Sequence, residues 1–512
     1  MAKFDASDLQ RLADDIPRSS QAVAAPLQNK NLTQLAETLD NRTSGSALSP
    51  VVISGAVRML EFVLIGCTGT LIHFLYQPGV HPLDYFYAIA MIDLLALVIF
   101  QAMHLNDIPA LRAPVRSGLK LLACWTLVFL ASQALVFLWK AEGIYSRVWL
   151  VSFFGIGFGL LMIERGIIAI IVRHLTRGGR LDRRTAIVGG GPSCDLLLQA
   201  LTRQVDSDLQ ICGVFDDRAD DRSPDLVAGF PKLGNVDDLV EFARHTRIDL
   251  IIFTVPITAE TRLLQMLRKL WVLPIDIRLS AHTNKLRFRP RSYSYIGNVP
   301  VLDVFDKPIA DWDVVLKTAF DRIVGALALL VLSPVLLAVA LAVKLDSRGP
   351  VFFRQKRHGF NNEPIDVWKF RSMYTDKLEY TSPTQATRND PRVTRVGRFI
   401  RRASLDELPQ LFNVVFFGNL SLIGPRPHPV NARTPDNTFE AVVDGYFARH
   451  RVKPGITGWA QVNGWRGETD TPEKLQNRVE HDLYYIENWS IFFDIYILAI
   501  TPFALINTEN AF

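Results

Sequence analysis

The sequence predicts three kinds of structure in one chain: an α-helical membrane bundle, a Rossmann-like α/β domain, and an α-rich, membrane-associated domain that contains a re-entrant helix. Three observations support this fold class. Long apolar segments fill much of the chain before residue 175, short β-rich runs then alternate with amphipathic stretches, and a last apolar run precedes an arginine-rich region. At 512 residues, the chain is long enough for three or four domains.

The overall composition is that of a membrane protein with soluble parts. The net charge of +5 comes from arginine clusters beside the apolar runs, which favours an anionic lipid surface and phosphorylated substrates over nucleic acid. On this charge pattern we expect no nucleic-acid partner. The four cysteines show no metal-binding spacing and no disulfide framework, a pattern typical of a reducing compartment.

Residues 1–50 are polar and mixed in charge. They contain no apolar core behind a basic start, so they predict a flexible cytoplasmic tail and no cleavable signal peptide. The first structured domain is expected to begin at residue 51.

Residues 51–175 predict a four-helix transmembrane bundle, because four apolar segments there approach the roughly 20 residues that a spanning helix requires. Basic residues follow the second and fourth segments, whereas the loop near 78–82 has none, so both ends of the bundle are expected in the cytoplasm. Glu164 and Arg165 lie inside the fourth segment, where an interhelical or snorkelling ion pair is favoured over a ligand site. The segments are Val51 to Tyr76, Tyr85 to Met103, Leu119 to Trp139 and Val148 to Val172.

Residues 183–285 predict a Rossmann-like domain with a mostly parallel sheet. The first β-rich run leads into the sequence GGGP at 189–192, which resembles a dinucleotide-binding turn, and Asp216 follows the second run, where a ribose-binding acid would lie. However, Cys194 occupies the third glycine position and Pro192 interrupts the turn. We expect a regulatory or dimerising domain, with a cofactor site as the alternative. The expected strands are Thr185 to Val188, Gly213 to Asp216, Leu250 to Val255 and Ile275 to Leu279.

Residues 286–313 predict a linker, and the last domain, residues 314–512, begins with an apolar run over 318–343. This run is long enough to span a membrane, but both of its flanks are basic, which opposes crossing. Ser333 and Pro334 lie in the middle of the run, where proline removes a backbone hydrogen bond and bends a helix. The sequence therefore predicts a re-entrant helix that enters and leaves the cytoplasmic face, with a kinked fifth span as the alternative. The flanking basic residues are Lys317, Arg322, Lys344, Arg348, Arg354, Lys356 and Arg357.

The chemistry of the chain is expected around Asp406 and Glu407, two adjacent carboxylates. A basic run over 388–402 precedes them, and the sequence Pro-Arg-Pro follows at 425–427. A carboxylate pair between arginines suits a phosphate ester and a divalent cation. This pattern predicts a phosphate-handling site.

The same residues also fit a purely structural role. Ser404 followed by Glu407 matches a capping box that opens an amphipathic helix. Pro409 would then fall at the fifth helical position, where its missing N–H matters, whereas Asp406 as the cap would leave it in the first turn. The two interpretations are compatible, because a helix N-terminus is itself an anion site.

Two further stretches lie downstream. The sequence KPGITGWAQV at 453–462 combines a tight Pro-Gly turn with donors that suit a phosphate or a base. Residues 488–506 predict an interfacial amphipathic segment, with an ordinary packed helix as the alternative.

From about Lys317 to the C-terminus, the sequence resembles the catalytic domain of the bacterial polyprenyl-phosphate hexose-1-phosphate transferases, the monotopic phosphoglycosyl transferases. The resemblance rests on the Ser333-Pro334 break and, in order, on KFRSM, DPRVTRVGRFIRRASLDELPQLFNV, SLIGPRP and KPGITGWAQVNG. The upstream bundle and Rossmann-like domain are similar to those of the large members, which start exopolysaccharide, capsule or O-antigen repeats. One departure is Asn419, where many members carry an aspartate.

The resemblance implies that residues 314–512 form the catalytic domain of a two-step enzyme. Asp406 would attack the β-phosphorus of a UDP-hexose, release UMP and retain the phosphosugar, which undecaprenyl phosphate would then accept. Mg²⁺ held by Asp406 and Glu407 would screen the diphosphate. The side chains expected to bind substrate are Arg371, Arg401, Arg402, Arg426, Lys453, Thr457 and Gln461.

The general likeness to glucose-type members, including His428 after the Pro-Arg-Pro sequence, favours glucose 1-phosphate over galactose 1-phosphate as the transferred group. The resemblance also implies a homodimer in the lipid of the bacterial inner membrane, with the catalytic domain facing the cytoplasm. A different class of function remains open, a non-enzymatic membrane scaffold whose Rossmann-like domain senses a nucleotide.

Overall fold

The computed structural model describes most of the chain from residue 48 onward, and the predicted tail over residues 1–50 lies almost wholly outside the described residues. Internal contacts divide the chain into two compact units, chiefly residues 38–183 and residues 184–512. The described ranges are 48–76, 82–140, 145–177, 179–204, 209–218, 224–256, 258–281, 294–296, 299–374, 390–429, 439–443, 445–465, 467 and 471–506.

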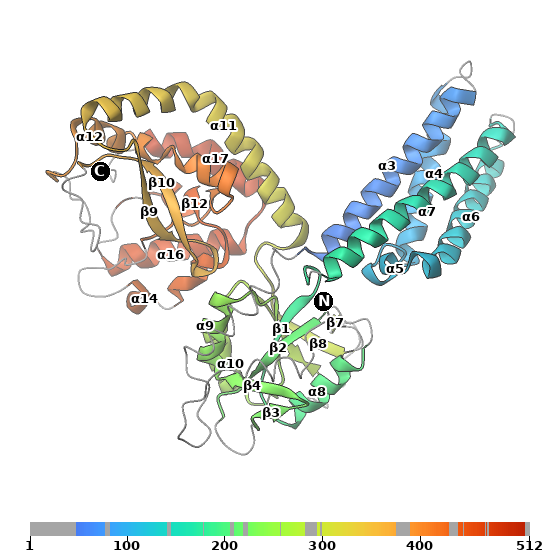
Figure 1. Cartoon of the computed structure of the whole chain (residues 1–512), viewed down its shortest axis with the longest axis horizontal. Helices are drawn as coiled ribbons and strands as arrows, with labels where there is room; N and C mark the ends of the chain where they lie inside the picture. Colours follow the sequence, from blue (N-terminus) through green and yellow to red (C-terminus); the bar gives the residue numbers. More distant parts are fainter. Residues whose placement is uncertain are drawn as a thin grey trace. The chain divides into compact units, whose positions relative to one another are not determined.

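The first unit contains four long apolar helices, each of which has the length and composition of a membrane span (Figure 1). They coincide with the four apolar segments of the sequence, so these predicted helices are confirmed. A short helix that the sequence did not predict, α5, lies between the second and third long helices. The bounds are α3 (Pro50–Tyr76), α4 (Pro82–Ala102), α5 (Ile108–Arg112), α6 (Pro114–Leu138) and α7 (Arg147–Arg177).

A buried ion pair joins two helices of this bundle. Arg165 of α7 pairs with Glu61 of α3 and donates to the backbone oxygen of Leu105 at 2.7 Å. The predicted interhelical ion pair is thus confirmed for Arg165, whose partner lies on another helix. Glu164 is also buried, with its Oε2 atom 3.8 Å from the Nε atom of Arg165.

The second unit begins with an eight-stranded sheet in the order β3-β4-β2-β1-β5-β6-β8-β7. Parallel pairing joins β2 to β4, β1 to β5 and β5 to β6, which confirms the predicted parallel-rich sheet. The strands are β1 (Arg183–Val188), β2 (Leu209–Phe215), β3 (Leu226–Val227), β4 (Phe230–Gly234), β5 (Leu250–Phe253), β6 (Asp276–Ser280), β7 (Ser294–Ile296) and β8 (Val299–Phe305). The helices among them are α8 (Pro192–Thr202), α9 (Val236–His245) and α10 (Glu260–Leu270).

The predicted linker over 286–313 is wrong in part, because β7 and β8 lie within it and extend the sheet by antiparallel pairing. Val299 and Val301 face the interior and are buried, whereas the residues between and after them are less so. This alternation is the signature of a half-buried strand. Pro300 argues against a strand when the sequence is read alone, but proline is tolerated near the beginning of a strand, where Pro300 lies.

The carboxylate of Asp216 is hydrogen-bonded to the glycine-rich turn within the domain. The Asp216 carboxylate accepts hydrogen bonds from the backbone N–H of Gly190 at 2.8 Å and of Arg218 at 3.1 Å. Pro192 opens α8 as one of its first residues, a favourable place for proline, rather than interrupting the turn as predicted. Asp216 stands where a ribose-binding acid would lie in a cofactor site, and here it ties the end of β2 to the glycine-rich turn.

The rest of the second unit is helical with two small sheets. The hairpin β9 (Phe352–His358) and β10 (Pro364–Phe370) is antiparallel, and β11 (Ser421–Ile423) pairs in parallel with β12 (Gly455–Thr457). The helices around them are α11 (Asp311–Asp346), α12 (Arg395–Arg402), α13 (Gln410–Phe412), α14 (Phe439–Val442), α15 (Trp459–Val462), α16 (Pro472–Glu487) and α17 (Ile491–Ile506). The predicted α-rich domain is thus confirmed, with these strands as an addition.

Helix α11 is continuous over 36 residues, contains Pro334, and bends along its course (Figure 1). Its first half packs on the domain that follows: Lys317 donates to the backbone oxygen of Ile423 at 3.0 Å. A Cβ atom on Gly325 would lie 3.1 Å from the side chain of Val415, so the helix backbone approaches that residue closely.

The second half of α11 packs on the same domain. Val343 belongs to an apolar cluster with Phe370 and Ile400, and the Asp346 carboxylate accepts a hydrogen bond from the backbone N–H of Val396 at 3.2 Å. Both ends of α11 are therefore attached to one compact domain. Between them, many apolar side chains of the helix face outward.

Candidate active site

Asp406 and Glu407, the carboxylate dyad of this site, lie in a short 3-10 turn, η5 (Leu405–Glu407), directly after α12. Ser404 has a φ of 56°, in the left-handed region, so the chain reverses there instead of continuing as a helix. The predicted capping box is wrong, because the Ser404 side chain makes no capping hydrogen bond with any described residue. Pro409 comes just before α13, where its missing N–H does no harm.

Apolar side chains on both sides of the carboxylates hold this turn in place. Leu405 and Leu408 pack on a buried cluster that includes Leu336 and Val339 of α11 and Ile400 of α12. The turn is thereby fixed to the second half of α11. The two carboxylates can keep a defined position without a regular helix under them.

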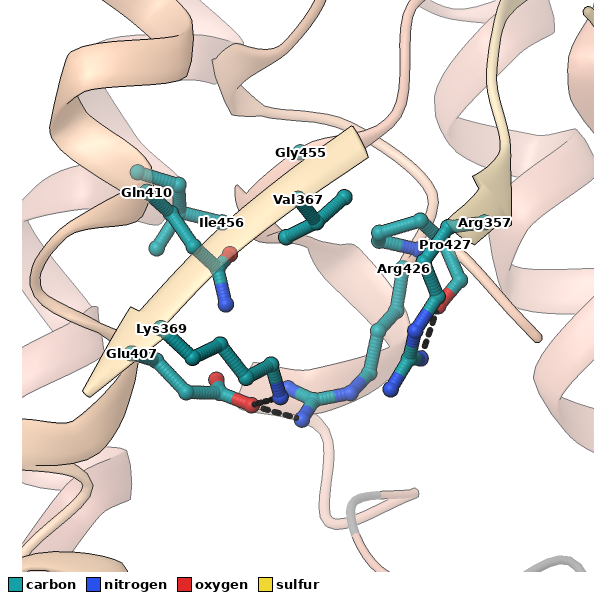
Figure 2. A pocket seen from close by; sticks show the side chains of 9 residues that line it. All are labelled: Arg357, Val367, Lys369, Glu407, Gln410, Arg426, Pro427, Gly455 and Ile456. Atoms are coloured by element: carbon teal, nitrogen blue, oxygen red, sulfur yellow. Dashed lines mark hydrogen bonds and ion pairs between the residues drawn. The ribbon is translucent and has the colours of Figure 1, made fainter. Parts of the chain in front are cut away.

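Glu407 lines a pocket whose walls come from the β9–β10 hairpin, the turn that carries the dyad, the segment after β11, and β12 (Figure 2). Charged ends occupy one side of this pocket and apolar or amide groups the other. The lining residues are Arg357, Val367, Lys369, Glu407, Gln410, Arg426, Pro427, Gly455 and Ile456.

The Glu407 carboxylate is held by two cations. Its Oε1 atom accepts hydrogen bonds from Lys369 Nζ at 2.8 Å and from Arg426 Nη2 at 2.6 Å (Figure 2). Burial by itself would raise the pKa of Glu407, but the charges of Arg426 and Lys369 hold it well below its usual range. Glu407 is therefore ionised at neutral pH, and it fixes both cations at the pocket wall.

Asp406 has different surroundings. It is half-buried, and within the described part of the chain it makes no hydrogen bond and no ion pair. Burial raises the pKa of the Asp406 carboxyl to about 6, against the opposing attraction of Lys369. At neutral pH the group is mostly ionised and unpaired, which is the state that a nucleophile or a metal ligand requires.

The Pro-Arg-Pro segment is held by its carbonyl groups. Proline has no backbone N–H, so this segment has few donors of its own and depends on donors from elsewhere. Pro425 O accepts from the Gly455 N–H at 2.9 Å, and His428 O accepts from the His358 N–H at 3.1 Å. Two arginine side chains donate to the carbonyl groups between these two: Arg449 to Arg426 O and Arg357 to Pro427 O.

The arginine that holds Arg426 O belongs to a buried polar network. Arg449 is fully buried, donates to Arg426 O at 2.8 Å, and forms an ion pair with Asp482 of α16. His428 lies between Arg449 and Arg478. Burial and these two arginines hold the pKa of His428 well below its usual range, so it is neutral. This network fixes the backbone from which Arg426 reaches Glu407.

The donor set fits the predicted Mg²⁺. Protein magnesium sites commonly use one or two carboxylates, with phosphate oxygens and waters as the other ligands. Within the described residues Asp406 is unpaired, and the ion pairs of Glu407 with Lys369 and Arg426 use only its Oε1 atom. No group of three or more His, Cys, Asp or Glu side chains that could hold a metal occurs among the described residues. The pair suits an ion that arrives with a diphosphate.

Of the residues predicted to bind substrate, Arg426 lines the pocket and contacts Glu407. Arg401 is near enough for its charge to lower the pKa of Asp406, but it does not line the pocket. Arg402 lies in the same last turn of α12 and is exposed.

Arg371 lies elsewhere. It is buried, and its guanidinium donates to the backbone oxygens of Val343 at 3.2 Å, Ser347 at 2.6 Å and Arg348 at 3.0 Å. These bonds satisfy carbonyl groups at the C-terminal end of α11. The structure therefore gives Arg371 a capping position rather than a place at the pocket.

The three predicted residues around β12 do not line the pocket either. Thr457 is hydrogen-bonded to Thr501 of α17, with 3.0 Å between their hydroxyl oxygens. Lys453 is exposed, and Gln461 Nε2 donates to the backbone oxygen of Ile456 at 3.4 Å. The motif contributes backbone and apolar lining instead of these side chains.

Lys369, Gln410 and Arg357 are pocket residues that the sequence did not single out. Lys369 is in the KFRSM sequence, two residues before Arg371, so the motif itself was the available signal. In a strand, residues two apart share a face, but β10 ends at Phe370 and the two cations separate. Arg357 carried no motif signal, because it stands in a generally basic stretch.

The departure at Asn419 has a structural use. Its Oδ1 atom accepts from Asn413 Nδ2 at 3.0 Å, and Asn413 bonds to the backbone of Asp366 and Trp368 on β10. An amide at 419 thus helps to attach the segment after the dyad to the hairpin.

Comparison with known proteins identifies two regions of the chain. Residues 312–508 match the family described as bacterial sugar transferase, and residues 107–281 match a CoA-binding domain. The first match contains the whole pocket described above.

Three relatives show how far the similarity extends. The UDP-glucose:undecaprenyl-phosphate glucose-1-phosphate transferase of Escherichia coli is 37% identical over 428 residues, 83% of this chain and 90% of the relative. The undecaprenyl-phosphate glucose phosphotransferase of Komagataeibacter xylinus is 41% identical over 362 residues, 69% of this chain and 64% of the relative. An exopolysaccharide production protein of Rhizobium leguminosarum is 50% identical over 186 residues, 36% of this chain and 92% of the relative. On this similarity, which covers most of the chain, the protein belongs to the bacterial sugar transferase family.

Proposed function

We propose that the protein transfers glucose 1-phosphate from UDP-glucose to undecaprenyl phosphate and releases UMP. High-coverage relatives carry this activity in their names. The proposal rests on the different surroundings of the two carboxylates in this chain. Asp406 is unpaired among the described residues, whereas Glu407 is held by Lys369 and Arg426. This arrangement suits a reaction between anions, in which fixed cations offset the repulsion.

The proposed reaction has two steps at Asp406. Its carboxylate oxygen forms a bond to the β-phosphorus of UDP-glucose while the bond from that phosphorus to UMP breaks, which leaves glucose phosphate on the carboxylate. A phosphate oxygen of undecaprenyl phosphate then attacks the same phosphorus and the carboxylate leaves. Asp406 is half-buried beside the pocket that Glu407 lines, so its burial excludes water from the intermediate only in part.

Lys369, Arg426 and Glu407 position charge around this reaction. Because Glu407 fixes both cations, their N–H groups are preorganised for phosphate oxygens, which is the form of electrostatic stabilisation that contributes most in enzymes. Mg²⁺ bound by Asp406 and Glu407 would supply further charge neutralisation of the diphosphate. The chain's own part is to hold Glu407 in the η5 turn, from which it fixes Lys369 of β10 and Arg426 after β11.

We also propose that α11 is re-entrant and that the dyad lies at the height of the lipid head groups. Contacts of both ends of α11 with one domain support this proposal, because they suit ends on the same side of a membrane. Exposed aromatic side chains flank the dyad: Phe399 is 65% exposed on α12, and Phe416 is 67% exposed on η6 (Asn413–Phe417). Exposed apolar side chains of this kind suit burial at the boundary of the lipid head groups, where the phosphate of a polyprenyl phosphate lies. The basic flanks of α11 favour the cytoplasmic side of the inner membrane for this interface.

A release assay tests the proposed function. Purified full-length protein with Mg²⁺, undecaprenyl phosphate and a panel of UDP-sugars should release UMP fastest from UDP-glucose. Asp406→Asn should lower the rate by about 1,000-fold or more, because the nucleophile is lost. Asp366→Asn is the matched control, since Asp366 is exposed on β10 and outside the pocket, and it should leave the rate unchanged.

Acid quenching tests the covalent step. Protein incubated with radiolabelled UDP-glucose in the absence of the lipid acceptor should retain label on the peptide that contains Asp406. Full turnover by Asp406→Asn, or label on another residue, would show that the nucleophile is assigned wrongly. Preference for another UDP-sugar would correct the substrate and leave the mechanism in place.

A further inference from the structure

We propose that Arg357 is a substrate-binding residue whose guanidinium binds a phosphate group of the nucleotide-sugar diphosphate, an inference that rests on the proposed transferase function. In the sequence, Arg357 is one of several basic residues that follow α11. The structure brings it from β9 to the pocket, where its charged end lies on the same side as those of Arg426 and Lys369 (Figure 2).

The charge balance of the pocket favours an anionic ligand. Lys369 and Arg426 share the Glu407 carboxylate, whereas Arg357 forms no ion pair with any described residue. Its hydrogen-bond partners are neutral oxygens, Pro427 O at 2.6 Å and Gln355 Oε1 at 2.7 Å. The lining therefore carries three cationic side chains against one carboxylate, which is already paired.

The guanidinium of Arg357 also has N–H groups that are available to a ligand. Arginine carries five N–H groups, and two of them in parallel bind a phosphate in bidentate fashion. Three hydrogen bonds are made, from Nε and Nη2 to Gln355 and from Nη1 to Pro427, which leaves two N–H groups without a partner among the described residues. Gln355 and Pro427 thus orient the guanidinium without saturating it.

Arg357 remains charged in this position. Burial, together with repulsion from Arg426, lowers the pKa of Arg357 to about 10, which still leaves it protonated at neutral pH. A half-buried cation without a counter-charge is unfavourable, and the binding of an anion relieves that cost. A diphosphate supplies the required charge next to the dyad.

A purely structural role for Arg357 is the alternative, since its bond to Pro427 O also steadies the segment that carries Arg426. The two roles differ in one measurable respect. If Arg357 acts only through Arg426, its removal has no further effect once the Arg426 side chain is gone. If Arg357 binds phosphate itself, its removal weakens binding in either background.

The test uses the full-length protein with UDP as the binding probe and UDP-glucose as the substrate. Arg357→Gln should weaken UDP binding at least tenfold, leave the binding of uridine unchanged, and lower kcat/KM about 100-fold, the usual effect of removing one preorganised donor. Arg357→Lys keeps the charge but not the paired donors, so it should recover part of the affinity. Lys356→Gln is the matched control, because the neighbouring Lys356 is exposed and outside the pocket, and it should behave as the wild type.

The double variant decides between the two roles. Adding Arg357→Gln to Arg426→Gln should weaken UDP binding by a further tenfold, and an unchanged affinity would overturn the inference, as would wild-type affinity in Arg357→Gln alone. Thermal unfolding of each variant shows whether it is folded, and Arg357→Lys carries the test if Arg357→Gln is not. Failure of the wild-type protein to release UMP from UDP-glucose would refute the proposed function instead, and UDP binding remains a separate readout.

Discussion

Asp406 and Glu407 are adjacent in the chain, yet their surroundings assign them different tasks. Glu407 reaches Lys369 and Arg426 from other parts of the domain and is held by both. Asp406 has no such partner among the described residues and keeps a raised pKa. A carboxylate that is tied up by two cations is a poor nucleophile, whereas an unpaired one is available to attack phosphorus. The structure therefore supports Asp406 as nucleophile and Glu407 as the residue that organises the site.

This division predicts distinct phenotypes for the two carboxylates. Glu407→Gln should lower kcat about 100-fold, because the amide leaves Lys369 and Arg426 without their counter-charge. It should still form a slow covalent adduct at Asp406, which Asp406→Asn should not form at all. Acid-quenched labelling with UDP-glucose measures both. Absence of any adduct in a folded Glu407→Gln protein, with Glu407→Asp retaining it, would instead make Glu407 part of the nucleophilic step.

Elements that meet at β11 and β12 give the pocket its rigidity. A Cβ atom on Gly455 would clash with the backbone nitrogen of Gly424, and one on Gly458 would clash with the Gly424 oxygen. Only glycine permits such an approach of two backbones. The same strands are tied to α11 and α17 through Lys317, which pairs with Asp494. These elements form one packed body beneath the Pro-Arg-Pro segment.

Asp494 is the residue whose loss should weaken this body most clearly. It is fully buried, lies 2.7 Å from Lys317 Nζ, and accepts a hydrogen bond from the Tyr485 hydroxyl at 2.7 Å. Asp494→Asn leaves the Lys317 charge buried with the less favourable Asp321 partner, so it should cost about 3 kcal/mol of stability. Asp313→Asn, at an exposed site in the first turn of α11, should cost well under 1 kcal/mol.

Thermal unfolding in detergent measures this difference. A drop in the unfolding temperature for Asp494→Asn, with none for Asp313→Asn, is the expected result. Equal unfolding temperatures for the two variants would mean that the buried pair does not hold α11, β11 and α17 together. Activity should fall with stability in Asp494→Asn, because β11 leads directly into the segment that carries Arg426.

On the scale of the whole molecule, the chain combines an apolar bundle, a parallel-rich sheet and a helical domain that begins with the long apolar helix α11. The four long bundle helices and α11 all have the length and composition of membrane spans, but both ends of α11 contact the same domain. At about 1.5 Å per residue, its 36 residues would extend roughly 54 Å if straight, far more than the roughly 30 Å of a hydrocarbon core. The bend is compatible with the proposed re-entrant course, in which both ends lie on one side of the membrane.

Cysteine labelling in intact cells tests this topology. In a variant without the four native cysteines, Lys356→Cys should react with an impermeant maleimide only after the membrane is permeabilised. Position 356 is suitable because it is exposed on β9, beyond the end of α11. Val80→Cys, in the loop predicted to be outside, should react in both conditions. Labelling of Lys356→Cys in intact cells would favour a fifth span over the re-entrant helix.

The sequence by itself determined the features that depend on local pattern. Apolar length predicted α3, α4, α6 and α7, and short β-rich runs predicted four of the eight strands of the large sheet. Ordered motifs predicted the enzyme family and the importance of Asp406 and Glu407. These signals lie within a few consecutive residues, so no distant contact is needed to read them. The same reasoning failed where a local pattern admitted two outcomes, as in the linker that contains β7 and β8 and in the capping box at Ser404.

Only the tertiary structure decided which side chains meet. Lys369 and Arg371 stand two residues apart in one motif, but the end of β10 sends the first to Glu407 and the second to the end of α11. Arg357, one of many basic residues in the sequence, reaches the pocket because β9 pairs with β10. The unpaired state of Asp406 depends in turn on where Lys369 and Arg426 arrive. Such relations arise from contacts between segments far apart in the chain, and no short stretch of sequence contains them.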